Sequence, residues 1–228
     1  MSMAQTAFLS ERIKTYCYAH RELAGRGVRG IKTLQRGEMR SAPGARWSSF
    51  TAEEYVDASR SGFCWNAQIG SGLTSVHVTD AYQDGHGRLV VKKGPLKLKE
   101  WRGPDVDKAE LQRYLAYVSY CPPMIDNNPS LQIESVGPRT VRVSDVSDKS
   151  EATVDLDVAD TGRILVARAM RPMTVGSRIV MTPWTATTDD FREVEGIRIP
   201  HMMEAAWDAP EGTFTYIRIE LQRVSLLK

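Results

Sequence analysis

The stretch FREVEGIRIP, residues 191–200, holds two short runs of alternating apolar and polar side chains on either side of Glu195-Gly196. Alternation with a period of two is typical of β-strands, and a glycine between two such runs is typical of a tight hairpin turn. The stretch therefore predicts a β-hairpin. Arg192 shares a strand face with the apolar Val194, so we expect Arg192 to face inward.

Runs of the same kind dominate the chain beyond residue 123, and turn signals such as DVSDKS, DTG and PEG separate them. FCWNAQI (63–69) and TSVHVTDAY (74–82) also alternate, and Asp84-Gly85 is a hairpin signal. A sheet of so many strands must curl, split or close. Beyond residue 123 we predict strands at about 131–136, 139–146, 151–158, 163–171, 178–184, 190–195, 197–201 and 213–224.

Three helices are predicted. An amphipathic pattern indicates an N-terminal helix within residues 1–26. Thr51 and Glu54 have the spacing of a capping box and predict a helix near 51–61. A third helix is expected near 105–121, where two prolines end it.

Two internal helices are too few to cover both faces of an open sheet. We therefore predict an α+β fold that is mostly antiparallel β. The whole chain, 1–228, forms a single domain, in which residues 27–228 build one large curved sheet, an open half-barrel, enclosing a few helices.

Composition excludes several classes of protein. The net charge is only +2. The densest basic run, residues 90–102, is typical of the solvated face of a strand pair. We therefore expect no nucleic-acid partner. Three cysteines without a short-spaced pair, and no apolar leader, indicate a cytoplasmic protein. No run approaches the roughly 20 apolar residues of a membrane span. The oligomeric state is left undetermined.

Motifs for metals, nucleophiles and cofactors are missing from the sequence. The four histidines have no metal-ligand spacing and no Cys-x-x-Cys occurs, so we predict no metal site. There is no Gly-x-Ser-x-Gly elbow and no phosphate-binding glycine loop. We therefore predict no cofactor.

Asp80 is the acid of greatest interest, because it shares a strand face with Val78 and Tyr82. A carboxylate among apolar side chains must be paired or protonated. Asp80 is thus either an ion-pair partner of Arg113 or Arg192, or a polar anchor or acid/base group in a cavity.

Glu110 and Arg113 lie one turn apart on the predicted central helix. They form either a solvated pair or, if the helix lies inside the sheet, one side of a pocket.

Two functions follow from a cavity in such a sheet. In the first, the chain binds an apolar or amphipathic small molecule. The polar end would be fixed by Asp80, Arg113 or Arg192, and the aromatic contacts would come from Trp65, Tyr82, Tyr114 and Trp184.

In the second, the chain is a cofactor-free biosynthetic enzyme of the isomerase, cyclase or lyase type. An acid/base pair drawn from Asp80, Glu110 and His77 would act in the same cavity. A third possibility is a structural or interaction protein whose core is filled by its own side chains.

The segment TPWTATTDDFREVEGIRIPHMMEAAWDAPEGTFTYIRIEL (182–221) resembles the C-terminal block of an uncharacterised bacterial family, known only as a domain of unknown function. Earlier blocks agree in order: QRGEMR, W..FTAEEY, GFCWNA, VTDAYQDGHGRL and ELQRYL. Tyr117 departs from the family pattern, which carries an acidic residue there. The resemblance implies an open half-barrel similar to lipoprotein carriers and to VioE of violacein biosynthesis, one such fold that became an enzyme.

Overall fold

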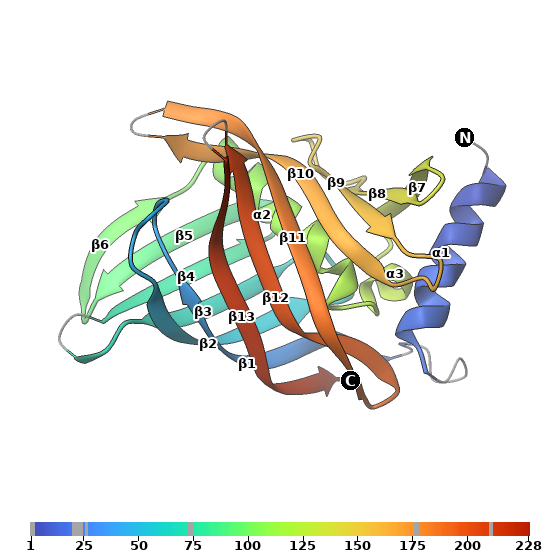
Figure 1. The fold of residues 1–228 in the computed structure, drawn as a ribbon, viewed down its shortest axis with the longest axis horizontal. Coiled ribbons are helices and arrows are strands. Elements are labelled where there is room, and N and C mark those ends of the chain that lie inside the picture. Colours follow the sequence, from blue (N-terminus) through green and yellow to red (C-terminus); the bar gives the residue numbers. More distant parts are fainter. Residues whose placement is uncertain (1–2, 20–24, 26, 73–74, 176–177, 210–211) are drawn as a thin grey trace.

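A computed structural model of the chain describes residues 3–19, 25, 27–72, 75–175, 178–209 and 212–228 (Figure 1). The helical segments are α1 (Met3–Cys17), α2 (Pro104–Ala116), the 3-10 turn η3 (Tyr117–Ser119) and α3 (Met124–Asn127). The strands are β1 (Gly30–Met39), β2 (Ser48–Asp57), β3 (Phe63–Ile69), β4 (Val76–Gln83), β5 (His86–Lys93), β6 (Leu96–Trp101), β7 (Leu131–Gly137), β8 (Thr140–Asp145), β9 (Thr153–Val158), β10 (Ile164–Val175), β11 (Arg178–Val194), β12 (Ile197–Ala209) and β13 (Gly212–Leu227).

The strands of the described residues form a single 13-stranded sheet in the order β6-β5-β4-β3-β2-β1-β13-β12-β11-β10-β9-β8-β7. Strands β1–β6 and β7–β13 are two meanders, and antiparallel pairing of β1 with β13 joins them. The edge strands β6 and β7 do not pair with each other, so the curved sheet stays open. The predicted antiparallel half-barrel is confirmed at this level.

Helix α2 bridges the two meanders. It contacts β4 and β5 on one side and β8, β9 and β10 on the other, while α1 packs against β7 and β12 at the far end of the sheet. Figure 1 shows α2 crossing between the edge strands, with α1 outside them. The α2 side chains Leu111 and Leu115 are fully buried, so this helix supplies the core with its apolar stripe.

The predicted helix at 51–61 is wrong, because residues 48–57 form strand β2. Phe50, Ala52, Glu54 and Val56 are all buried along β2, which is the period-two alternation of a strand with one buried face. Thr51 and Glu54 have the spacing of a capping box, but β2 pairs with β1 and β3, and this pairing outweighs the local helix signal.

Other boundaries also shift. The N-terminal helix is shorter than predicted, since α1 ends at Cys17, and residues 20–24 and 26 of the prediction lie outside the described residues. The strands predicted at 178–184 and 190–195 form one strand, β11, which pairs with β10 and β12. The helix predicted near 105–121 divides into α2 and η3.

The two hairpin turns are confirmed. Asp84-Gly85 has φ values of 51° and 84°, and Glu195-Gly196 has 47° and 83°. Positive φ at both central residues is the signature of a type I′ turn, whose twist matches that of the flanking strands. FREVEGIRIP therefore contains the end of β11, the Glu195-Gly196 turn and the start of β12.

Gly87 in β5 sets how closely α2 approaches the sheet. A Cβ at this position would lie 2.5 Å from the carbonyl oxygen of Val106, and the Gly87 amide donates a hydrogen bond to Asp107 Oδ1 at 2.7 Å. We expect Gly87→Ala to lower the free energy of unfolding by roughly 1–3 kcal/mol, because the added methyl must push the start of α2 away. Urea unfolding measures this change.

Gly62→Ala is the matched control, since its Cβ would meet its nearest atom, the Tyr82 carbonyl oxygen, at 3.4 Å. Equal losses for the two variants would contradict close packing of α2 on β5.

Candidate functional site

A cavity of about 620 Å³ lies between α2 and the inner face of the sheet. Its walls come from both meanders, from β3–β6 on one side and from β10–β13 on the other, with α2 between them. The wall is mainly apolar, and tryptophans and tyrosines contribute much of it. The aromatic members are Trp65, Trp101, Tyr117, Tyr120, Trp184, Trp207 and Tyr216.

A row of inward side chains crosses five neighbouring strands under α2. Cross-strand pairing places Glu54 beside Trp65, Trp65 beside Asp80, Asp80 beside Leu89, and Leu89 beside Trp101. Side chains directly opposite each other on paired strands are in contact. Strand register therefore brings two carboxylates to the inner face with one tryptophan between them.

Arg113 of α2 reaches down onto this row. Its Nη1 donates to Asp80 Oδ2 at 2.5 Å, and its Nη2 donates to Glu54 Oε1 at 3.0 Å. The guanidinium also lies 4.8 Å and 5.3 Å from the ring centroids of Phe63 and Trp65, within cation–π range. The ion pair of Asp80 with Arg113 is therefore present, and Asp80 also lines the cavity.

Glu54 is the most deeply buried charge of the site, with only 2% of its surface exposed. Besides Arg113, it accepts hydrogen bonds from Gln35 Nε2 at 2.8 Å and from the Tyr117 hydroxyl at 2.7 Å. The Gln35 amide oxygen in turn accepts from Trp65 Nε1 at 2.9 Å. Several donors on one carboxylate offset the cost of taking that charge out of water.

Glu110 lies one turn before Arg113 and faces the cavity, so the solvated Glu110–Arg113 pair is excluded. Burial, together with the negative charge of Asp80, raises the pKa of Glu110 to about 8. Oε2 of Glu110 and Oδ1 of Asp80 are both buried without a hydrogen-bond partner among the described residues. A proton on Glu110 lets these two neighbouring carboxyls coexist.

Arg171 of β10 is the second cation of the cavity wall and is 6% exposed. Its guanidinium stacks 4.6 Å from the Trp184 ring centroid, and Nη2 donates to the Ala109 carbonyl at 2.7 Å. The Arg171 Nε and the Thr188 hydroxyl have no partner among the described residues, and both residues line the cavity. The cavity therefore offers unused donors as well as unused acceptors.

Four of the seven predicted binding residues line this cavity: Trp65, Asp80, Arg113 and Trp184. Tyr82 and Tyr114 are buried in the packed core instead. The Tyr114 hydroxyl donates to the backbone carbonyl of Asp57 or of Arg60, each 3.0 Å away. Tyr82 and Tyr114 therefore lie on β4 and α2, which both contribute to the cavity wall, but their own side chains do not line the cavity.

The inward placement of Arg192 is wrong. Its side chain is 58% exposed, and it pairs with Asp190 at 2.5 Å. The ion pair with Asp190, two residues away, keeps the Arg192 guanidinium at the surface, although Val194 on the same strand face is apolar. His77 is also exposed and lies over the outer face of the sheet, apart from Asp80 and Glu110.

Sequence reasoning missed several residues of the site. Glu54 was assigned to a helix, although its alternation with Ala52 and Val56 would have placed it on a buried strand face. Arg171 stands in the run ARAMRPM, which contains no acid, and nothing in that run marks it as buried. Tyr117 uses its hydroxyl to bridge Arg113 and Glu54.

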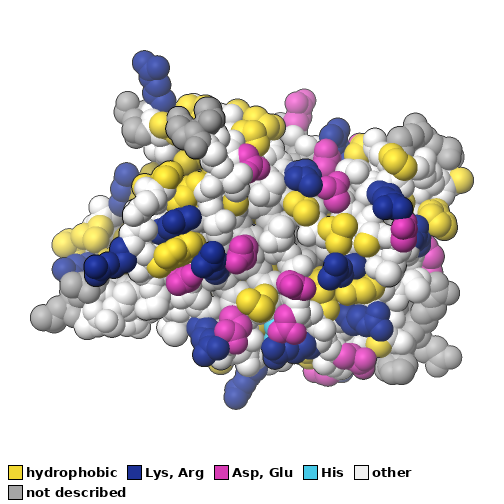
Figure 2. Space-filling model, in the orientation of Figure 1, with side chains coloured by type: hydrophobic (Ala, Val, Ile, Leu, Met, Phe, Trp, Pro, Cys, Tyr) yellow, Lys and Arg dark blue, Asp and Glu magenta, His cyan; other side chains and the backbone are white. Residues whose placement is uncertain are grey.

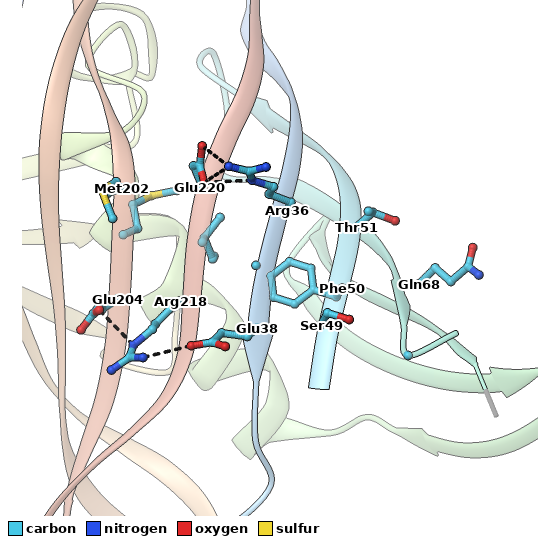
Figure 3. Close-up of a pocket in the computed structure, with 14 residues that line it drawn as sticks. Arg36, Glu38, Ser49, Phe50, Thr51, Gln68, Met202, Glu204, Arg218 and Glu220 are labelled. Carbon is cyan, nitrogen blue, oxygen red and sulfur yellow. Dashed lines mark hydrogen bonds and ion pairs between the residues drawn. The ribbon is translucent and has the colours of Figure 1, made fainter. Parts of the chain in front are cut away.

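A second hollow, of about 600 Å³, lies over exposed side chains of β1, β2, β12 and β13 (Figure 3). Its charged side chains pair with one another: Arg36 with Glu220 at 2.7 Å, and Arg218 with Glu38 at 3.0 Å and with Glu204 at 3.1 Å. Because each of these lining charges already has an ion-pair partner, the inner cavity is the stronger candidate.

In the part of the chain that the structure describes, no three His, Cys, Asp or Glu side chains gather as metal ligands would. Among the same residues, no helix combines the length and the apolar character needed to cross a bilayer.

The fold is similar to solved half-barrels. A LolA superfamily protein from Nitrosomonas europaea aligns with a TM-score of 0.52 and 10% identity, over 98% of this chain and 94% of that one. A domain from Vibrio parahaemolyticus, described as a putative outer membrane lipoprotein-sorting protein, aligns with a TM-score of 0.54 and 8% identity, over 100% and 94%. At such identities the likeness concerns the fold alone.

Comparison with curated proteins found no match. The sequence profile of one family, described as a family of unknown function, DUF6544, matches residues 11–219. That range contains every strand from β1 to β12 and all of α2. The chain therefore belongs to the DUF6544 family.

Proposed function

We propose that this chain binds one apolar or amphipathic small molecule in the cavity between α2 and the inner face of the sheet. The observation that carries the proposal is a cavity of about 620 Å³, walled by aromatic side chains, in which buried polar atoms remain without partners. Small-molecule pockets of proteins have this size and this combination of an apolar wall with a few polar groups.

The polar atoms specify the head group of the ligand. Asp80 Oδ1 is an unused acceptor, the protonated carboxyl of Glu110 can donate, Arg171 Nε is an unused donor, and the Thr188 hydroxyl can act as either. A hydroxyl, carboxylic acid or amide group both donates and accepts, so it fits this set. A quaternary ammonium group offers no donor, and a phosphate would meet the Asp80 carboxylate.

The half-barrel neighbours support an apolar ligand at the level of fold, since one of them is described as a lipoprotein-sorting protein. In our proposal the sheet encloses α2, and α2 closes the cavity on one side. The three free cysteines support a reducing compartment such as the cytoplasm.

Filling the cavity should abolish binding. Ala186 lines the cavity, so we expect Ala186→Phe to block the ligand while keeping the fold. The probes are a series of fatty acids, fatty alcohols and fatty amides of increasing length, read by thermal melting. A bound probe at a hundredfold excess over its dissociation constant stabilises the wild type by about 2.7 kcal/mol.

The matched control is Ala81→Phe on the opposite face of β4, which should bind like the wild type. If no probe in the series raises the melting temperature of the wild type, or if the two variants respond alike, the binding proposal fails.

A second candidate function is cofactor-free acid/base catalysis of the isomerase, cyclase or lyase type. The specific observation is the pair of buried neighbouring carboxyls, in which Glu110 has a raised pKa of about 8 while Asp80 is paired with Arg113. Two acids with separated protonation states can respectively donate and accept a proton. Turnover without added cofactor that Asp80→Asn abolishes would favour this candidate over simple binding.

Both candidate functions depend on Glu110 being protonated near neutral pH, and this has a consequence for stability. The pKa of Glu110 is about 8 in the folded chain and 4.5 for the unperturbed group, so between these pH values the folded state alone holds the proton. Stability therefore falls as pH rises through this window, by at most about 1.4 kcal/mol per pH unit. Glu110→Gln, which keeps a neutral side chain, should escape the fall.

We thus expect the advantage of Glu110→Gln over the wild type in free energy of unfolding to grow between pH 5 and pH 8, in chemical denaturation. Glu134→Gln, at an exposed position, serves as the control and should show no such growth. A constant difference across this range would show that Glu110 titrates like a solvated acid.

A further inference from the structure

Two exposed apolar segments flank the cavity. The first is the free end of the β10–β11 hairpin, where Val175, Ile179, Val180 and Met181 are each 43–53% exposed. The second is the edge strand β6, where Leu96 and Leu98 are 62% and 50% exposed. Large apolar side chains grouped at the surface mark interaction sites more often than single ones do.

Both segments continue directly into the cavity wall. Arg171 and Pro172 of β10 line the cavity, and the exposed end of the hairpin begins three residues further on. Trp101, the last residue of β6, also lines it, three residues after Leu98. The two exposed segments therefore form the rim of the cavity, and we call them the rim.

The β5–β6 side of the rim is strongly basic. Residues 88–102 contain six Lys or Arg and one acid, for a net charge of +5, and the exposed Arg178 adds a cation at the hairpin end. The whole chain carries +2, so the residues outside 88–102 together carry −3. Figure 2 shows hydrophobic and basic side chains side by side over β6.

Few acids neutralise the β5–β6 side of the rim. Arg88, Lys97 and Arg102 all share the single carboxylate of Glu100, at 3.0, 2.7 and 2.7 Å. Among the described residues, no ion pair engages Lys92 or Lys93, and both are exposed. Lysine on an edge strand also discourages strand addition, but that role does not explain the exposed leucines between the lysines.

We propose that the rim docks on an anionic lipid membrane surface, with the hairpin end and the β6 leucines inserted at the interface and the basic side chains facing the lipid phosphates. Apolar insertion combined with a basic patch is the pair of signals that gives stable peripheral binding. A nucleic acid would use the charge but leave the apolar side chains without a role.

Docking in this orientation sets the cavity opening against the bilayer, so an apolar ligand can pass between lipid and cavity without crossing water. This step rests on the proposed function, whereas membrane docking itself does not. The two ideas are therefore tested with different readouts.

The test is co-sedimentation of the purified full chain with vesicles of phosphatidylcholine alone or mixed with phosphatidylglycerol. We expect binding to the anionic vesicles, weakening as salt rises from about 0.05 M to about 0.5 M because the Debye length shrinks. Lys93→Gln should raise the lipid concentration for half-binding roughly fivefold.

The hairpin is tested with threonine, which keeps the preference for a strand. Ile179→Thr with Val180→Thr should weaken anionic-vesicle binding about tenfold through lost insertion. Leu34→Thr with Met202→Thr, at exposed positions of β1 and β12, is the matched control and should bind like the wild type.

Ala186→Phe separates this proposal from the proposed function, because it fills the cavity without touching the exposed rim. We expect it to bind anionic vesicles normally. Membrane docking would be overturned if the wild type failed to bind anionic vesicles, or if the hairpin and control variants had equal effects. It would also be overturned if the chain bound double-stranded DNA and the hairpin variant left that binding unchanged, or if the hairpin proved to mediate self-association.

Discussion

The guanidinium of Arg113 joins helix α2 to two strands at once, and the rest of the site depends on this bridge. It binds Glu54 of β2 and Asp80 of β4, which lie on either side of Trp65 in the row across the sheet. Side-chain exposures of 18%, 2% and 12% for Arg113, Glu54 and Asp80 place all three away from water. Buried charges of this kind persist only when paired and hydrogen-bonded.

The same bridge determines the chemistry of the cavity. Arg113 occupies only Oδ2 of Asp80, so Oδ1 stays unused beside Glu110, and this proximity together with burial keeps Glu110 protonated at neutral pH. Gly87 lets the start of α2, one turn before Glu110, lie close against β5. A contact that fixes a helix on a sheet thereby creates a proton-bearing pair at the wall of an apolar cavity.

Much of the fold could be predicted from period-two alternation and turn chemistry. FREVEGIRIP and Asp84-Gly85 form the predicted hairpins, since a type I′ turn is a local property of a few residues. The helix predicted at 51–61 failed because a capping-box spacing is also local, whereas the pairing of β2 with both neighbours is not visible in one sequence.

The site was predictable only in part, for the same reason. Alternation placed Trp65 and Asp80 each on a strand face with apolar side chains, and cross-strand pairing puts both on the inner face. Alternation could not show which end of that face α2 fills. Tyr82, two residues beyond Asp80, lies in the filled end, while Val78, two residues before it, lies in the open end. Arg171, which pairs with Thr182 on β11, joins the cavity through a diagonal contact with the Trp184 ring and through its long-range hydrogen bond to the Ala109 carbonyl of α2.

The most direct test of this account is the free energy of unfolding of Arg113→Met, compared with that of the triple variant Arg113→Met, Glu54→Gln, Asp80→Asn. The single change leaves two buried carboxylates unpaired, and we predict a loss of about 3–5 kcal/mol. Neutralising both acids removes that penalty, so the triple variant should recover most of the loss. A single variant as stable as the wild type, or a triple variant no more stable than the single one, would contradict the account.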